Sequence, residues 1–139
     1  MVFRRRWSVD ELNARNPGTL NEALGIRFTE VGEDHVRATM PCDGRTKQPF
    51  GLLHGGANVA LAETLGSIAG LMALDEGAGR TVGIEINANH VRAVRDGLVT
   101  GTARPVHVGR STQVWEIRID DAEGRLACIS RITLAVVTA

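Results

Sequence analysis

The stretch Gln48-Pro49-Phe50-Gly51-Leu52-Leu53-His54-Gly55-Gly56, followed by the run from Ala57 to Leu74, decides the fold of this chain. The run is rich in Ala and Leu, which favour helix, and its apolar side chains recur at helical spacing. The only full charge between Lys47 and Asp75 is Glu63. Because desolvating a lone carboxylate costs several kcal/mol, we expect Glu63 to be a functional group held in a dry place, rather than an exposed point on the helix.

The predicted helix is apolar nearly all round, a pattern typical of a helix buried in protein or of one that spans a membrane. Polar residues interrupt the run, so no window of about 20 apolar residues exists and we expect no membrane partner. Gly66 and Gly70 leave a smooth strip on one side of the helix. We expect a sheet to approach the helix closely along this strip.

The length of 139 residues predicts a single domain over residues 1–139, with short helices in residues 1–25. The formal net charge is +0, which argues against nucleic acid or an anionic membrane surface as a partner. Cys42 and Cys128 lie far apart in no metal-type spacing, so we expect two reduced core residues and a cytoplasmic location. No apolar region follows the arginines at 4–6, so no signal peptide is expected.

Two short helices are predicted near the N-terminus. Ser8 and Glu11 have the spacing of a capping box, which marks the start of the first helix. Thr19 and Glu22 repeat that spacing, and Gly25 suits the C-terminal cap of the second helix. We expect these helices to lie on the surface or over the mouth of a pocket.

Six strands are predicted, two before the long helix and four after it, over residues 26–31, 35–40, 81–94, 97–108, 111–120 and 125–137. Asp96-Gly97 is a hairpin signal between the third and fourth strands, and Pro105 indicates an edge position or a bulge. A curved antiparallel sheet wrapped around one apolar helix satisfies this order, which makes the fold class α+β. Such a sheet leaves one face open, which favours an oligomer.

One set of residues around the long helix could act on an activated acyl group. Glu63 and Ser67 are four residues apart and share a helix face, so the hydroxyl could orient the carboxylate. The N–H groups at the helix start, near Gly55, carry the positive end of the dipole and could polarise a carbonyl oxygen, with the Gln48 amide beside them. A carboxylate opposite such donors suits the cleavage of a thioester.

Simpler interpretations of these residues remain open. Gly55-Gly56 could only begin a tightly packed helix, and His54 alone is more often a hydrogen-bonded structural histidine than a catalyst. Glu63 could pair with an arginine across an interface. The chain has no HExxH, CxxC, GxGxxG or GxxxxGK[ST] pattern, so common metal and dinucleotide sites are not predicted.

A second group of polar residues lies on the predicted strands. His90 and Arg92 point to the same face of a strand, and Arg110-Ser111 forms part of a turn. Arginine is well suited to bind phosphate through its planar fork. A solvated sheet face with scattered charges explains the same pattern, and on these residues alone it is the preferred interpretation.

The stretch from Gln48 to Gly56, with Glu63 and Ser67 after it, resembles the hotdog-fold acyl-CoA thioesterases, in their phenylacetic-acid-degradation and Arthrobacter-type 4-hydroxybenzoyl-CoA branch. Within that branch, Gly83-Ile84-Glu85-Ile86-Asn87-Ala88-Asn89-His90 and Gln113-Val114-Trp115 are most similar to the bacterial thioesterases that act on 1,4-dihydroxy-2-naphthoyl-CoA in menaquinone synthesis. The resemblance covers nearly the whole chain.

The resemblance implies a role for each residue of the first set. Glu63 would attack the thioester carbonyl or activate a water molecule, and Ser67 would hold Glu63 or that water. The Gly55 N–H, helped by Gln48, would polarise the thioester oxygen. His54 would position the substrate or the thiol leaving group.

The resemblance also implies what binds and how the chain assembles. The residues near CoA, which is part of the substrate, would be Val82, Gly83, His90, Arg92, Arg110 and Ser111. No metal and no other cofactor is implied. The sites would lie between two subunits of a homo-oligomer, a tetramer built as a dimer of dimers.

Four further hypotheses stay open beside an aryl-CoA thioesterase. The chain could be a thioesterase of broad specificity for medium-chain acyl-CoA, or one that acts on acyl carrier protein. It could also be a hydratase or dehydratase on the same fold, or a non-catalytic module that binds acyl-CoA. The sequence leaves the acyl group and the carrier undecided.

Overall fold

The apolar run forms α3 (Gly55–Met72), the central helix of a computed structural model that describes residues 1–139. Gly66 and Gly70 do allow a close approach by the sheet. A Cβ atom at Gly66 would lie 2.5 Å from Ile132 Cγ2, and one at Gly70 would collide with Leu134 Cδ1. The smooth strip predicted from the sequence is therefore confirmed as the contact between helix and sheet.

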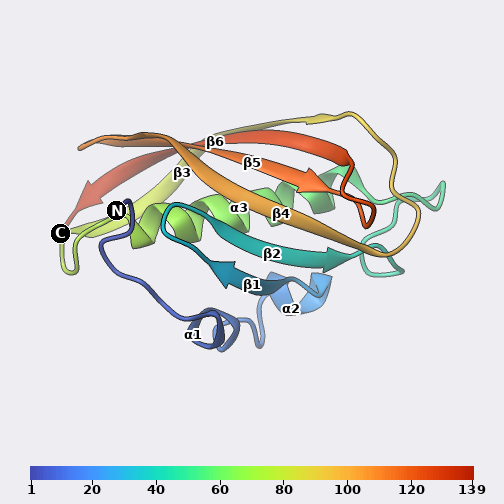
Figure 1. Cartoon of the computed structure of the whole chain (residues 1–139), viewed down its shortest axis with the longest axis horizontal. Coiled ribbons are helices and arrows are strands. Elements are labelled where there is room, and N and C mark those ends of the chain that lie inside the picture. Colours follow the sequence, from blue (N-terminus) through green and yellow to red (C-terminus); the bar gives the residue numbers. More distant parts are fainter.

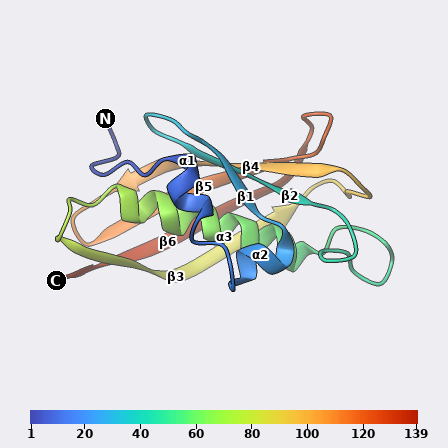
Figure 2. The ribbon, with the colours of Figure 1, turned by 90° about the horizontal axis from the view of Figure 1, so that it is seen from below.

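Six antiparallel strands make one sheet, which curves around α3 (Figures 1 and 2). The strands are β1 (Arg27–Val31), β2 (Val36–Pro41), β3 (Gly79–His90), β4 (Leu98–Val108), β5 (Thr112–Asp120) and β6 (Leu126–Thr138). Their order across the sheet is β1-β2-β4-β5-β6-β3, so β1 and β3 form the two edges. A curved sheet wrapped around one long helix confirms the expected hotdog fold.

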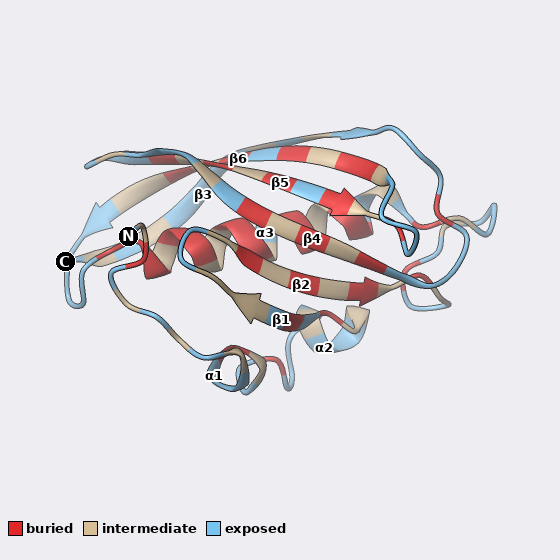
Figure 3. Ribbon diagram, in the orientation of Figure 1, coloured by how far each residue is buried: buried red, intermediate tan, exposed pale blue.

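The core lies between α3 and the concave face of the sheet, where the buried residues of both gather (Figure 3). Trp115, Ile117 and Ile119 alternate along β5 and are fully buried, as their spacing predicts. Gln113 is also fully buried, and its amide donates to the Gly70 carbonyl at 3.3 Å and accepts from Trp115 Nε1 at 2.8 Å. This buried amide is satisfied on both sides and ties the sheet to the helix.

Cys42 and Cys128 are buried and form no disulfide, as expected. Burial raises the pKa of both thiols, because it disfavours the thiolate. The two side chains therefore act as small core residues and not as nucleophiles.

The hairpin predicted at Asp96-Gly97 is wrong. β3 pairs only with β6, whereas β4 lies between β2 and β5. The segment 91–97 instead carries the chain across the structure. Two of its carbonyl groups accept hydrogen bonds of 2.8 Å: Val94 O from Leu53 N–H, and Gly97 O from Cys42 N–H. The local turn survives, since Gly97 has a φ of 78°, but it does not join neighbouring strands.

The N-terminal helices α1 (Val9–Asn13) and α2 (Leu20–Leu24) lie beside β1 and below the sheet edge (Figure 1). Ser8 and Glu11 form the predicted capping box, and Gly25 caps α2 with a φ of 73°. Thr19 makes no side-chain cap, because its hydroxyl donates to the Asn16 carbonyl instead. None of the three helices combines the length and the hydropathy that crossing a bilayer requires.

Candidate active site

Gln48 lies in a tight loop that precedes α3. Lys47 and Leu53 pair as an isolated antiparallel bridge, and Gln48 N–H donates to the Leu52 carbonyl at 2.8 Å. The side-chain oxygen of Gln48 accepts a hydrogen bond from the Phe50 N–H. With its oxygen held in this way, the amide NH₂ of Gln48 remains as a donor for a bound molecule.

The start of α3 leaves one backbone donor free. His54 is the N-cap, and its Nδ1 accepts a hydrogen bond from Gly56 N–H at 2.8 Å, so the ring caps the helix. Gly55 is the first helical residue, so its N–H has no partner within the helix. The His90 ring packs against Gly55, since a Cβ atom added at Gly55 would lie 2.9 Å from His90 Nε2.

These donors face one cavity of about 400 Å³, which we call the loop pocket. Its wall contains four of the predicted site residues, Gln48, Gly55, His90 and Arg92. The wall also contains Asn58, a residue on the first turns of α3 for which the sequence predicted no role. A polar residue three positions after Gly55 on an otherwise apolar helix was the available signal.

Glu63 is exposed in the single chain, so the chain alone does not provide the dry environment expected for it. Its carboxylate reaches the edge of the sheet, where a Cβ atom at Gly83 would lie 2.7 Å from Glu63 Oε2. Ser67 is half-buried one turn further along α3, but no hydrogen bond links it to the carboxylate. We call Glu63, Ser67 and Gly83 the carboxylate face.

The loop pocket and the carboxylate face cannot meet on one substrate within one chain. Glu63 follows Gly55 by eight residues, which places them about 12 Å apart along the helix axis. A carbonyl group in reaction has to lie about 3 Å from both the nucleophile and the donor. Within one chain, Gly55 and Glu63 are therefore too far apart to contact the same carbonyl group.

The residues expected near CoA also fall into two groups. Thr112 pairs with Ala135 and Ala135 with Val82, so Arg110 and Ser111 end the sheet on the same side as Val82 and Gly83. His90 follows Val82 by eight strand residues, about 26 Å away, and Arg92 lies beside it. The single chain brings His90 and Arg92 to the loop pocket and the other four residues to the opposite end.

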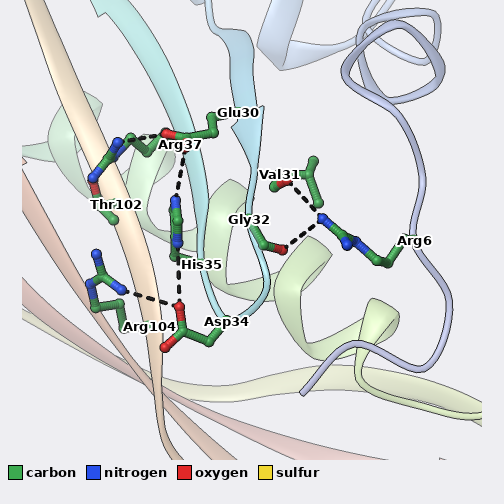
Figure 4. Close-up of polar contacts among 9 residues, drawn as sticks. All are labelled: Arg6, Glu30, Val31, Gly32, Asp34, His35, Arg37, Thr102 and Arg104. Carbon is green, nitrogen blue, oxygen red and sulfur yellow. Dashed lines mark hydrogen bonds and ion pairs between the residues drawn. The ribbon is translucent and has the colours of Figure 1, made fainter. Parts of the chain in front are cut away.

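A second polar cluster lies at the turn between β1 and β2 (Figure 4). His35 lies 3.3 Å from both Glu30 and Asp34, and Arg37 and Arg104 pair with the same two carboxylates. The contacts with His35 and then with Arg37 hold the pKa of Glu30 below its usual value. Its charges are matched within the cluster itself, which fits a role in pinning the hairpin to β4.

Three comparisons place the chain among known proteins. The family model described as Thioesterase superfamily matches residues 50–128 of the chain. The chain is 52% identical to 1,4-dihydroxy-2-naphthoyl-CoA hydrolase of Escherichia coli, over 98% of this chain and 99% of that protein. It is 53% identical to a proofreading thioesterase of Cronobacter turicensis, over 98% of each chain.

A solved structure gives the same picture in three dimensions. The crystal structure of a thioesterase from Haemophilus influenzae superposes with a TM-score of 0.96 at 48% identity, over 99% of this chain and 96% of that one. The similarity spans the N-terminal helices as well as the sheet and α3.

Proposed function

The chain belongs to the thioesterase superfamily and is a thioester hydrolase, and from this premise we propose that it hydrolyses aryl-CoA thioesters with Glu63 as its catalytic carboxylate. The observation that carries the proposal is the pairing of functions on α3. Its first residue, Gly55, offers a free N–H, and its one carboxylate, Glu63, has no partner in the protein. The Gly55 N–H can bind the carbonyl oxygen of the thioester, and Glu63 can act as the nucleophile or the general base.

In the proposed reaction, the thioester oxygen accepts hydrogen bonds from the Gly55 N–H and the Gln48 amide. Glu63 either attacks the carbonyl carbon to give an anhydride, which water then cleaves, or removes a proton from the water that attacks. In both routes the C–S bond breaks, and the thiolate leaves with its electron pair and takes up a proton. The oxyanion donors stabilise the charge on oxygen, a contribution of about 10²–10³ in rate for each donor.

A second copy of the chain would complete the site. The edge strand β3 exposes apolar side chains, with Val82 37% and Ile84 61% exposed. A long unpaired edge of this kind invites pairing with another strand. If two copies join along β3, Glu63 of one copy can face Gly55 of the other, and Glu63 is then removed from bulk water. A dimer of such dimers is the assembly that we propose.

The substrate proposal rests on the relatives. The Escherichia coli relative acts, by its name, on 1,4-dihydroxy-2-naphthoyl-CoA, which has a bulky aromatic acyl group. We infer the same class for this chain, with no metal and no other cofactor. The similarity to a proofreading thioesterase favours a second candidate, a broad-specificity enzyme that acts on several acyl groups carried by CoA or by acyl carrier protein.

Replacement of the carboxylate tests the proposal. Glu63→Gln is expected to lower thiol release from benzoyl-CoA and from 1,4-dihydroxy-2-naphthoyl-CoA by roughly three orders of magnitude or more. Glu76→Gln, the same change at an exposed position after α3, is the matched control and should keep full activity. Wild-type rates in Glu63→Gln would remove Glu63 from the mechanism.

Two further measurements refine the proposal. A screen of aryl and aliphatic thioesters on CoA and on carrier protein ranks the two candidate substrate classes. Single-turnover hydrolysis in ¹⁸O-labelled water, followed by mass analysis of the protein, detects the anhydride route when water attacks the Glu63 carbonyl carbon, whereas base catalysis leaves the protein unlabelled. Label on Glu63 indicates an anhydride that water opens at the enzyme carboxyl.

A further inference from the structure

A second cavity lies beside the start of α3, next to α2, and shares no residue with the loop pocket. We call this cavity of about 300 Å³ the α2 pocket. It is several times larger than the share of one water molecule, roughly 30 Å³, so it has room for an organic group. The side chains that line it and matter below come from α2, from α3 and from the segment before α3, and they are Leu20, Leu24, Ala57, Ala60, Lys47 and His54.

The α2 pocket lies close to Glu63 of the same chain. Ala60 precedes Glu63 by three residues, which places the two on one face of α3, about 4.5 Å apart along the axis. The residue after Glu63, Thr64, donates from its Oγ1 to Asn21 Oδ1 at 3.2 Å, so a hydrogen bond holds α2 at this level of α3. A group that is bound at Glu63 can therefore extend into the α2 pocket within about one turn of the helix.

The two substituents of a thioester carbonyl leave it in different directions. The residues of this chain that are expected near CoA, apart from His90 and Arg92, lie at the end of the sheet away from the start of α3. The α2 pocket lies toward the start of α3. When the thiol arm of a substrate points to the first of these places, its acyl group points to the α2 pocket.

The wall of the α2 pocket combines apolar side chains with two donors. Lys47 is the single lysine of the chain and is exposed, and the nearby carboxylate of Asp43 is already bound by Arg45 at 2.7 Å. The His54 ring accepts the Gly56 N–H at Nδ1, so in its neutral form it carries a proton on Nε2 and can donate there. An apolar cleft with a few polar groups suits a flat aromatic group that carries an oxygen substituent better than a plain alkyl chain.

We propose that the acyl group of the substrate binds in the α2 pocket of the chain whose Glu63 acts on it. Its ring packs against Leu24 and Ala60, and an oxygen on the ring accepts a hydrogen bond from the Lys47 ammonium. The inference rests on the proposed thioesterase function and adds to it the site that selects the acyl group. Lys47 then favours hydroxylated aryl groups, and Ala60 limits the size of the ring that fits.

A pair of substrates isolates the hydrogen bond from Lys47. 4-Hydroxybenzoyl-CoA and 4-methylbenzoyl-CoA have nearly the same shape, but only the hydroxyl can accept a hydrogen bond. In Lys47→Met, the ratio of kcat/KM for the hydroxyl over the methyl substrate should fall roughly 3–10-fold below that of the wild type, the value of one hydrogen bond. The intrinsic reactivities of the two thioesters cancel in this comparison.

Loss of a positive charge alone is controlled by Arg118→Met, a change at an exposed cation of β5 that should keep the wild-type ratio. A ratio that stays at the wild-type value in Lys47→Met would contradict the role of Lys47 in selection.

Filling the α2 pocket tests where the ring lies. Ala60→Leu places a larger side chain in the wall, and it should lower kcat/KM for benzoyl-CoA by roughly 10-fold or more, while acetyl-CoA, whose acyl group ends before the pocket, is little affected. Ala122→Leu, the same change at an exposed turn, should leave both values unchanged. An equal loss on both substrates in Ala60→Leu, at an unchanged Tm, would place the ring elsewhere.

Covalent capture keeps the inference separate from catalysis. S-(4-Formylbenzyl)-CoA is a thioether that cannot be hydrolysed, and its aldehyde takes the place of the ring oxygen. If the ring lies in the α2 pocket, the aldehyde forms an imine with Lys47, which cyanoborohydride reduces to a stable amine. Because Lys47 is the only lysine, mass analysis of peptides identifies this adduct unambiguously against the one other amine, the N-terminus.

An adduct on Lys47 that Ala60→Leu suppresses supports the inference even if the chain hydrolyses no thioester. 4-(Methylthiomethyl)benzaldehyde, which has the same ring without CoA, measures the background reaction of an exposed amine and should label Lys47 much less. Labelling of Lys47 at this background level by the CoA compound would overturn the inference, whereas the role of Glu63 would still stand on the loss of hydrolysis in Glu63→Gln.

Discussion

At the scale of single residues, the space above Gly83 governs where the Glu63 carboxylate, proposed here as catalytic, can lie. A Cβ atom at this position would come within 2.7 Å of Glu63 Oε2. Because the colliding atom is the end of a flexible side chain, Gly83→Ala should displace Glu63 with little loss of stability. We expect kcat/KM to fall by roughly 10²-fold, the cost of a misplaced reacting group, at a nearly unchanged Tm.

Kinetics with a CoA thioester and thermal unfolding provide both values for Gly83→Ala. Gly44→Ala is the control, because a Cβ atom there would meet nothing within 4 Å. Full activity in Gly83→Ala would show that the carboxylate does not work from the position it has beside β3.

A second prediction at this scale concerns Asp43, whose carboxylate binds the Arg45 guanidinium at 2.7 Å and the Arg45 N–H at 3.0 Å. These contacts lower the pKa of Asp43 to about 2 from its ordinary 3.8. A lowered carboxyl pKa stabilises the fold above the unfolded value, and this contribution is lost as the pH falls from about 4 to about 2. Urea unfolding across this window should show a smaller loss of stability in Asp43→Asn than in the wild type.

Single residues differed in how far the sequence predicted them. Glu63 stood out because it is the one charge in a long apolar run, but the dry environment expected for it is absent from the single chain, where its side chain is exposed. His54 could be recognised as a candidate, but only the structure reveals that its ring caps α3. The sequence shows Asn58 only as a polar residue near the start of an apolar helix, and its unpaired buried acceptor could not be predicted, because it is a property of the packed state.

At the scale of elements, the contact between α3 and the sheet depends on the absence of side chains at Gly66 and Gly70. Ala favours helix over Gly by about 1 kcal/mol, so propensity alone predicts that Gly70→Ala stabilises the protein. The new methyl group would collide with Leu134 Cδ1 and lie 2.8 Å from Gln113 Oε1. Overpacking of this kind costs typically 1–3 kcal/mol, and the expected sum is a net loss.

Chemical denaturation of Gly70→Ala and of Gly44→Ala measures the two effects side by side. Gly44 lies in open space at an ordinary φ, so its replacement should be neutral or slightly stabilising. A gain in stability for Gly70→Ala would mean that the sheet can move away from the helix at no cost.

The elements themselves were largely predictable, because most of their signals are local. The capping box at Ser8, the alternation through Trp115 and the bulge at Pro105 all lie where their residues indicate. The hairpin at Asp96-Gly97 failed for a physical reason. A turn dipeptide sets the local backbone, whereas the pairing of β3 with β6 depends on residues more than 35 positions further along the chain.

At the scale of the whole molecule, the separation of Gly55 and Glu63 along α3 predicts that copies of the chain share active sites. Glu63→Ala lacks the carboxylate and Gln48→Ala lacks a donor of the loop pocket, so each variant alone should be nearly inactive. When the two are unfolded together and refolded, a mixed dimer contains one site with both groups intact. We expect about a quarter of the wild-type activity to return, since half of the dimers are mixed and half of their sites are complete.

Each variant refolded alone provides the baseline for this experiment. Recovery in the mixture means that Glu63 and Gln48 come from different copies at each site. If activity stayed at the sum of the two separate variants, the site would have to form within one chain, against the 12 Å spacing expected along α3.

The position of β3 in the sheet has a consequence for how the protein is made. β3 gains its neighbour in the sheet only from β6, which is made more than 35 residues after β3. Until then, apolar surface of α3 and the unpaired backbone groups of β3 stay exposed during synthesis, a state prone to aggregation. The emergence of β6, rather than that of the long helix, is therefore the moment at which this sheet can close.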